Sequence, residues 1–367
     1  HCTCVIPLTH QDIAADRELA AAPQAQPFPL ILGGHEHAAF IEEINKTWLI
    51  KAGAEAINAV IINLCWPAAA PQSGLDLPTV SVQMEPVANY PEDAALRHRV
   101  DARMVAVHEL ETATLMRLPP QQTLTSVGTR VRPSSMATLL CSRIRDALGS
   151  DGCLLNGGGI RGNRVYSERF TYGDLKAELP FENEVTVVKL PGHVIAEAIR
   201  SSRAHAPAES GGYLHGDDGM IIDEPAHTLR QVDHKPLDPE HVYRIAVMRN
   251  LMLGMDHIEP LVRYGTEHPE DLPAEGSGRG IKLVLIDAFS RELWKQLGPF
   301  EDVDTNRDGK LSESEIADAV TRVTAAPASK ITVDFLLKAA DEDKNREISR
   351  DEIQKIWNPP EKPKTTK

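Results

Sequence analysis

The stretch Leu155-Asn156-Gly157-Gly158-Gly159-Ile160-Arg161-Gly162 says most about the fold of this chain. It places a glycine run after a short apolar segment and contains a G-x-G-x-x-G match of the kind that binds dinucleotides. The residues that follow, Asn163 to Tyr166 and Phe170 to Tyr172, lack the helical pattern that would direct a helix N-terminus at a pyrophosphate. No Lys-Ser or Lys-Thr pair follows the glycines, so the pattern argues against both a dinucleotide fold and a P-loop.

Two further motifs follow the glycine run, Thr171-Tyr172-Gly173-Asp174 and Leu179-Pro180-Phe181. Together the three motifs resemble the signature of the 5′-nucleotidase C-terminal domain. The resemblance implies a substrate-binding domain, because arginine donates in a fork that matches phosphate and an aromatic face suits a nucleobase. The substrate-binding residues that it implies are Arg130, Asn156, Gly158, Arg161 and Phe181.

Two positions depart from that family and leave the substrate open. Ile258 stands where a second aromatic wall is expected, and Ala137-Thr138 stand where a Gly-Asn pair is expected. The resemblance therefore implies a phosphate ester as substrate but leaves base recognition open, so a sugar phosphate, a nucleotide-sugar or another phosphate ester stands as the alternative to a nucleoside monophosphate. Phe181 as a core residue and Arg130 as a solvated surface charge are the structural alternatives.

Three histidines follow two apolar runs near the start of the chain. His10 follows Leu8-Thr9, and His35 and His37 follow the glycine pair Gly33-Gly34. Neutral imidazole suits first-row divalent metals, and histidines at the ends of neighbouring strands can approach one ion or two adjacent ions. Without further context, these histidines are equally compatible with surface or core positions. The spacing differs from HExxH, so it does not indicate a zincin-type protease.

Gly34-His35-Glu36-His37 resembles the last metal motif of calcineurin-like phosphoesterases, and Leu8-Thr9-His10 resembles the motif before it. The resemblance implies that His10 and His35 bind one metal and His37 the other, with Zn, Mn or Co as the metal. The earlier motifs of that family, which include the bridging carboxylate, do not occur in this sequence. We therefore expect a truncated chain that is inactive by itself, with a genuine pseudoenzyme as the alternative.

Residues 304 to 315 match the twelve-position loop of a calcium-binding EF-hand, with glycine at position six and glutamate at position twelve. Calcium takes six to eight oxygen ligands, which explains the acidic and amide side chains at alternate positions. The predicted ligands of this first loop are Asp304, Asn306, Asp308, the carbonyl of Lys310, and Glu315. Gly298-Pro299 leaves only a short turn before the loop, so its entering helix is expected to be truncated or bent.

A second loop of the same kind spans residues 341 to 352. Its predicted ligands are Asp341, Asp343, Asn345, the carbonyl of Glu347, and Glu352. Arg346 occupies the position that requires a positive φ, which costs a non-glycine residue about 1 kcal/mol. We therefore expect the second loop to bind calcium more weakly than the first. A calcium-free structural EF-hand is the alternative for each loop.

Composition narrows the class of protein. The 367 residues are 42% hydrophobic and 25% charged, which is typical of globular proteins, and the formal charge of −14 argues against a nucleic-acid binder. No apolar run approaches the roughly 20 residues needed to span a membrane. The five cysteines form no CxxC pair and favour buried free thiols. The sequence does not distinguish a cytoplasmic from a secreted protein, because a chain that begins at His1 rather than Met carries no information about a signal peptide.

The predicted fold class is a multidomain α/β (α+β) protein. We expect the end of a metallophosphoesterase β-sandwich with flanking helices at 1–85, a linker helix at 86–120, a mixed α/β substrate-binding domain at 121–289, an all-α EF-hand pair at 290–358 and a disordered tail at 359–367. The periodicity further predicts a helix from Glu92 to about Leu118, a strand at Ile281–Leu285 and a mobile loop from Ala206 to Gly219.

The sequence thus supports two functions. The first is a metal-dependent phosphoric-ester hydrolase of the 5′-nucleotidase type, acting on a nucleotide or other phosphate ester and carrying calcium on its EF-hands. The second is a non-catalytic calcium-responsive module that contacts a protein partner through the EF-hand pair.

Overall fold

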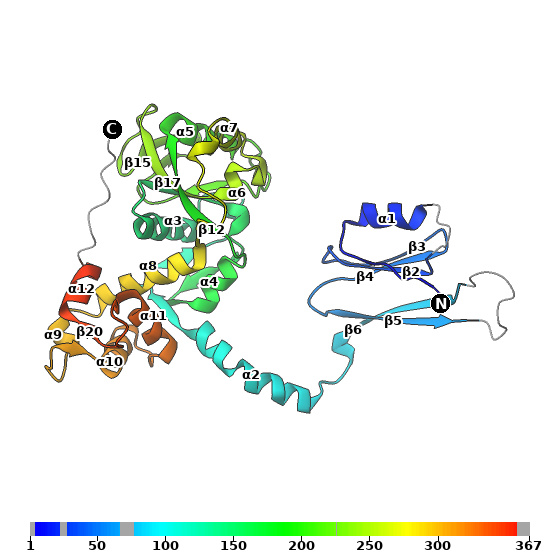
Figure 1. Ribbon diagram of the computed structural model, residues 1–367, viewed down its shortest axis with the longest axis horizontal. Coiled ribbons are helices and arrows are strands. Elements are labelled where there is room, and N and C mark those ends of the chain that lie inside the picture. Colours follow the sequence, from blue (N-terminus) through cyan, green and yellow to red (C-terminus); the bar gives the residue numbers. More distant parts are fainter. Residues whose placement is uncertain (1–3, 23–27, 67–76, 225, 358–367) are drawn as a thin grey trace. The chain divides into compact units, whose positions relative to one another are not determined.

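The computed structural model describes residues 4–22, 28–66, 77–224 and 226–357 (Figure 1). It divides into two compact units, His1–Ala102 and Arg103–Lys367. The chain is mixed α/β and multidomain, as its sequence predicts. The tail at 359–367 lies outside the described residues.

The first unit is built on a four-stranded sheet with the order β1-β2-β4-β3. The strands are β1 (Leu8–Thr9), β2 (Leu30–Gly33), β3 (Ala39–Ile44) and β4 (Thr47–Ala52). β1, β2 and β4 run parallel, and β3 pairs antiparallel with β4. Helix α1 (Ile13–Ala21) begins at Asp12, whose carboxylate accepts from Ala15 N at 2.8 Å, and its apolar side packs on the sheet.

A separate antiparallel hairpin, β5 (Asn58–Cys65) and β6 (Thr79–Pro86), continues the first unit and ends in the 3₁₀ turn η1 (Val87–Asn89). Helix α2 (Ala94–Thr112) then leads into the second unit. It is shorter than predicted, because Thr114–Arg117 leave the helix and form strand β7. Among the described residues, no helix combines the length and apolarity needed to cross a bilayer.

The second unit is centred on a five-stranded sheet with the order β13-β9-β17-β12-β18. The strands are β9 (Gly152–Asn156), β12 (Glu184–Pro191), β13 (Leu214–Gly216), β17 (Val242–Met248) and β18 (Arg279–Gly280). β9 and β17 are parallel, whereas the other pairs are antiparallel. The central strands are apolar on both faces, which is typical of a sheet covered on both sides.

Helices cover both faces of this sheet (Figure 1). On one face lie α3 (Ser135–Leu148) and α8 (Ile281–Gln296), and on the other lie α5 (Gly192–Ser201), α6 (Arg249–Met252) and α7 (Glu259–Glu267). Side chains alternate between the two faces along β9. Cys153 and Leu155 pack in the core beneath α3 and α8, and Leu154 packs in the core beneath α5, α6 and α7.

Shorter elements complete the domain. They are β8 (Thr123–Thr125), η2 (Gly157–Gly159), β10 (Val165–Ser167), β11 (Arg169–Thr171), α4 (Tyr172–Glu178), β14 (Ile221–Asp223), β15 (Thr228–Val232), β16 (Lys235–Pro236), η3 (Met255–His257) and η4 (Pro269–Asp271). The motif Thr171 to Asp174 forms a capping box, in which the two side chains satisfy each other's backbone N–H groups at the start of α4.

The C-terminal part of the second unit is a pair of helix–loop–helix elements. It contains α9 (Phe300–Val303), β19 (Lys310–Leu311), α10 (Glu313–Thr324), α11 (Lys330–Ala340), β20 (Ile348–Ser349) and α12 (Arg350–Trp357). Gly298, at a φ of 98°, and Pro299 interrupt the entering helix, so α9 is one short turn, as expected. Trp294 of α8 packs inside this core and donates from Nε1 to Leu336 O at 2.9 Å.

Two predictions of local structure are wrong. Residues 281–285 form the first turns of α8 rather than a strand, because Ile281, Val284, Leu285 and Ala288 are buried at helical spacing. A five-residue apolar window cannot separate these two periods. The segment 206–219 is no mobile loop as a whole, because it contains β13 and the buried residue His215.

The cysteines follow the sequence prediction in part. Cys141 and Cys153 are buried free thiols of the first core of the second unit, whereas Cys65 is exposed at the end of β5. Cys2 lies outside the described residues.

Candidate functional site

The two predicted substrate-binding arginines line one pocket of the second unit. The pocket has a volume of about 310 Å³ and is lined by Gly128, Thr129, Arg130, Ile160, Arg161, Asn163 and Glu209. Arg130 lies between β8 and α3, and Arg161 follows the glycine run, so residues far apart in the sequence meet here. No described residue pairs with either guanidinium through an ion pair or a hydrogen bond. Both remain available to an anion.

Phe181 lies beside the second arginine. The guanidinium carbon of Arg161 is 5.5 Å from the centre of the Phe181 ring, within the range of a cation–π contact. The ring is 45% exposed, so it is not the core residue that was considered as an alternative. Phe181 also lines a narrow crevice together with Asn156 and Ile281. The ring therefore orients Arg161 and still presents an aromatic surface.

The glycine run packs backbone against backbone rather than cradling a phosphate. Gly157 N donates to Tyr213 O at 2.8 Å, and Gly158 N donates to Gly211 O at 2.7 Å. A Cβ on Gly157 would lie 2.2 Å from Thr129 O, so only glycine fits against the segment that carries Arg130. A 3₁₀ turn and not a helix follows β9, in agreement with the rejection of a dinucleotide fold.

Asn156 is 4% exposed, and its side chain is engaged within the protein. The amide Nδ2 donates to Asp256 Oδ2 at 2.5 Å, while Oδ1 has no hydrogen-bond partner in the described part of the chain. Asp256 itself adopts a φ of 58°, an uncommon conformation for a non-glycine residue. No local pattern in the sequence points to Asp256 as a partner, because the pair spans one hundred positions.

Two buried groups anchor the arginine segments. His215 Nε2 lies 2.7 Å from Thr129 O, and since a carbonyl can only accept, the neutral ring donates from Nε2. Glu178 accepts from Gly162 N at 3.2 Å through its carboxylate, and its backbone carbonyl accepts from Arg161 N at 2.8 Å. The sequence carries no local signal for either anchor, because both act across strands and turns.

Burial lowers the pKa of His215 to about 4, against an ordinary value of 6.5. Its hydrogen bond to Thr129 O opposes the shift without cancelling it. The ring is therefore neutral near pH 7, and protonating it requires moving a charge into the core.

In the first unit, the structure brings two of the three predicted metal-binding histidines together. The rings of His10 and His35 lie edge to face with centres 5.5 Å apart. A Cβ on Gly34 would lie 3.0 Å from His10 Nδ1, so the glycine gives the ring its space. His35 adopts a φ of 79° at this turn. Imidazole nitrogens have the chemistry of transition-metal ligands, and the contact places two of them in neighbouring turns.

A complete metal centre needs more ligands than this pair. Among the described residues, only two groups of three His, Cys, Asp or Glu side chains have ligand atoms within 4.8 Å of one another, and His10, His35 and His37 do not form one of them. The carboxylate nearest in sequence, Glu36, is paired with Lys51. The described part of the first unit thus supplies no carboxylate that bridges two of these imidazoles.

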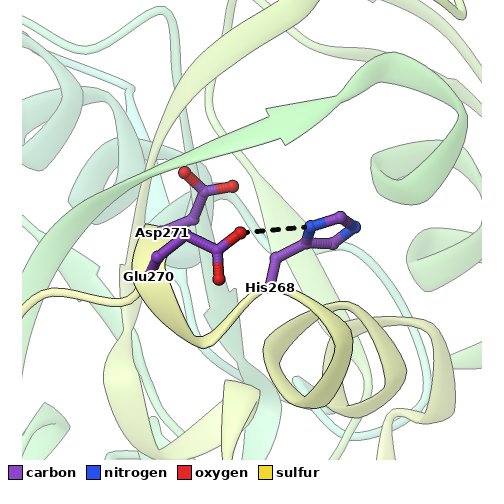
Figure 2. A group of neighbouring side chains, drawn as sticks. All are labelled: His268, Glu270 and Asp271. Atoms are coloured by element: carbon purple, nitrogen blue, oxygen red, sulfur yellow. Dashed lines mark ion pairs between the residues drawn. The ribbon is translucent and has the colours of Figure 1, made fainter.

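One of the two groups is His268, Glu270 and Asp271 (Figure 2). His268 Nδ1 lies 3.7 Å from Glu270 Oε1, and its ring lies against that of Tyr264, whose hydroxyl donates to Asp271 at 2.9 Å. These contacts stabilise the turn that follows the C-terminal end of α7. We assign this group no ligand.

The first predicted calcium loop has the backbone that its sequence indicates. Gly309 at position six adopts a φ of 84°, and its N–H donates to Asp304 Oδ2 at 3.0 Å. Burial opposes ionisation of Glu315, but hydrogen bonds from Ser312 and the 305–306 turn outweigh it and lower its pKa to about 2. Position twelve is therefore a carboxylate at any pH where the protein is used.

The second loop differs at position six. Arg346 adopts a φ of 64°, the strained conformation that was predicted, and its guanidinium pairs with Glu313 of the first hand and Asp334 of α11. Asp341, Asp343 and Glu352 converge within 4.8 Å. The two loops pair through β19 and β20, with Leu311 opposite Ile348, both buried.

We expect the protein to lose stability in acid through His215. The unfolded chain binds a proton on His215 more tightly than the folded chain does. The free energy of unfolding is therefore highest above pH 6.5 and falls as the pH drops toward 4. The loss amounts to about 2 to 3 kcal/mol between pH 7 and pH 4.5. Urea denaturation of His215→Gln at both pH values should show a correspondingly smaller loss than the parent chain. The exposed His193→Gln is the control, and equal losses in all three proteins would contradict the assignment.

We expect two calcium-binding events of unequal affinity. Isothermal titration of the chain should show a weaker site that disappears in Glu352→Gln and a tighter site that disappears in Glu315→Gln, because only the second loop holds a non-glycine residue at position six. A strain of about 1 kcal/mol corresponds to roughly a fivefold difference in Kd. Equal dissociation constants, or loss of the tighter event in Glu352→Gln, would show that the ion pairs of Arg346 offset the strain.

Comparison with known proteins identifies two regions. Residues 111–263 match the family model of the 5′-nucleotidase C-terminal domain, and residues 296–357 match that of an EF-hand domain pair. Protein UshA of Yersinia enterocolitica is 27% identical over 128 residues, which cover 35% of this chain and 23% of UshA. The chain thus spans less than a quarter of the length of that relative.

Among solved structures, a 5′-nucleotidase precursor from Thermus thermophilus is 18% identical with a TM-score of 0.44, over 78% of this chain and 61% of its own. A putative 5′-nucleotidase from Staphylococcus aureus is 15% identical with a TM-score of 0.48, over 72% and 53%. The family-model matches carry the assignment. Residues 111–263 of this chain therefore form a region of the 5′-nucleotidase C-terminal domain type, followed by an EF-hand domain pair at 296–357.

Proposed function

We propose that this chain belongs to a metal-dependent phosphoric-ester hydrolase of the 5′-nucleotidase type and that its second unit binds the substrate. The observation that carries the proposal is the pocket lined by Arg130 and Arg161, two guanidiniums without an ion-pair partner among the described residues, in a region that matches the 5′-nucleotidase C-terminal domain. The substrate is a nucleotide or another phosphate ester.

The pocket suits a phosphate with an attached polar or aromatic group. Two guanidiniums supply forked donors to the phosphate oxygens, and a hydrogen bond to a charged group contributes roughly 1.5 to 3 kcal/mol. Phe181 orients Arg161 before the ligand arrives, which reduces the entropy lost on binding. Glu209 lines the same pocket and would accept from sugar hydroxyls rather than contact the phosphate.

The histidines of the first unit would hold the metal. His10 and His35 would share one ion, and His37 would bind a second. Bound divalent metals polarise a phosphoryl oxygen and supply hydroxide near neutral pH. Because the described residues add no bridging carboxylate to these imidazoles, we expect the chain alone to be inactive toward phosphate esters.

A non-catalytic calcium-binding module derived from a 5′-nucleotidase is the second candidate. One reason for it is that no described carboxylate lies in a common group with His10, His35 and His37. The other is the EF-hand pair, whose core includes residues of α8. Both candidates predict phosphate binding. They differ in turnover: the hydrolase candidate requires that a chain supplemented with the remaining metal ligands hydrolyse a phosphate ester with Mn²⁺, Co²⁺ or Zn²⁺.

We expect Arg161→Met to weaken the binding of adenosine monophosphate about 10- to 100-fold, because the variant loses a charge-assisted contact. The matched control is Arg164→Met, three residues further on, whose exposed guanidinium does not line the pocket. Isothermal titration of the whole chain measures both, with inorganic phosphate as a second ligand.

Phe181→Ala distinguishes the contribution of the base from that of the phosphate. It should weaken adenosine monophosphate more than inorganic phosphate, since only the former offers a ring to stack. Equal affinity of Arg161→Met and the parent chain for both ligands would rule out this pocket as the phosphate site.

A further inference from the structure

A buried lysine joins the two histidine-bearing turns of the first unit. Lys51, on β4, has a side chain that is 1% exposed, and its ammonium lies 2.8 Å from Asp16 Oδ2, in a carboxylate that is 0% exposed. The same ammonium pairs with Glu36. Burial disfavours the charged form, but the contacts with Asp16 and Glu36 outweigh it and raise the pKa of Lys51 above its ordinary value.

The other partners of the ammonium are backbone carbonyls next to the histidines. Lys51 Nζ donates to Gln11 O at 2.9 Å and to Gly34 O at 2.9 Å. Gln11 follows His10 directly, and Gly34 precedes His35 directly. One side chain from a third strand thus holds the residue after one histidine and the residue before the other.

Two further contacts connect the residues around the Lys51 ammonium with one another. Gln11 Nε2 donates to Asp16 Oδ1 at 2.9 Å, and the Glu36 carboxylate accepts from Ile13 N, in the first turn of α1. Glu36 itself lies between His35 and His37. The ion cluster therefore ties both histidine turns to α1 and β4.

The two glycines before the histidines have separate steric reasons. A Cβ on Gly33 would lie 2.8 Å from Lys51 Cε and 2.9 Å from Asp16 Oδ2, so the first glycine lets the lysine pass. A Cβ on Gly34 would crowd His10, so the second glycine lets the imidazoles approach each other. Glycine is therefore required at one position by the lysine and at the other by the histidine.

We propose that Lys51 is a positioning residue that fixes the turns of His10 and His35 in the arrangement needed to share one divalent first-row metal ion. The inference rests on the proposed function for the identity of the ligand. Lysine suits the role because a compact ammonium has three donors that it can direct at carbonyls and carboxylates from different segments. Groups that orient metal ligands typically change metal affinity roughly 10- to 100-fold when removed.

The test uses the whole chain with calcium in excess, so that the EF-hands are filled, and Co²⁺ as the probe. Lys51→Met alone leaves Asp16 buried and unpaired and is expected to destabilise the first unit. The double variant Lys51→Met/Asp16→Leu removes the two fully buried charges and keeps an apolar contact in their place, while the partly exposed Glu36 carboxylate still accepts from Ile13 N. Arg17→Met is the control, because it breaks an exposed ion pair between α1 and β3 that does not touch the histidine turns.

Visible absorption of Co²⁺ gives the first readout. The folded double variant should bind Co²⁺ at least about tenfold more weakly than the parent chain, with a changed d–d spectrum, whereas Arg17→Met should match the parent. Folding is checked by circular dichroism. A folded double variant with the affinity and spectrum of the parent would overturn the proposal.

Nuclear Overhauser contacts between the rings of His10 and His35, measured without metal, give the second readout. We expect these contacts in the parent and in Arg17→Met and their loss in the double variant. If the parent binds no Co²⁺, the proposed metal function fails, yet the ring contacts still decide the role of Lys51. Contacts that persist in the folded double variant would refute it.

Discussion

Helix α8 supplies side chains to two hydrophobic cores at once, and the organisation of the second unit depends on that sharing. Its first half, with Ile281, Val284 and Phe289, packs under the sheet of the pocket domain. Its last turns, with Trp294, fill the core of the EF-hand pair. Because a helix propagates cooperatively and buried apolar area dominates stability, we expect the two cores to behave as one cooperative body. The helix also begins beside the candidate substrate site, since Ile281 lines the same crevice as Phe181.

The two candidate sites share a construction principle. In each, charged or imidazole side chains lie in turns and loops that are held by buried groups contacting backbone carbonyls. His215 holds the carbonyl of Thr129 beside Arg130, and Lys51 holds the carbonyl of Gly34 beside His35. Glycine lies at the contact in both places, because the backbone segments approach too closely for a Cβ. The functional side chains need not pair with one another and stay open to a ligand.

The sequence predicts those parts of the structure that depend on local rules. The calcium loops follow a twelve-position pattern, so their turns, their pairing strands and the strain at Arg346 could be predicted. The meeting of His10 and His35 could be predicted as well, because parallel strands end at a common edge. The resemblance of the glycine run to the 5′-nucleotidase domain is confirmed by the match over 111–263.

What the sequence misses depends on distant contacts. Lys51 stands in an apolar strand without any local sign of its four partners, and Asp256 meets Asn156 from the far end of the domain. The strand predicted at 281–285 is the start of α8, whose period shows only over its full length.

Residue-specific hydrogen exchange of α8, with and without calcium, tests the shared helix most directly. We expect calcium to slow exchange at Val284 and Leu285 as well as at Trp294, because a ligand stabilises every part of a cooperative body. Slowing confined to residues after Ser290 would show that the hands and the pocket domain open independently, and would contradict the account.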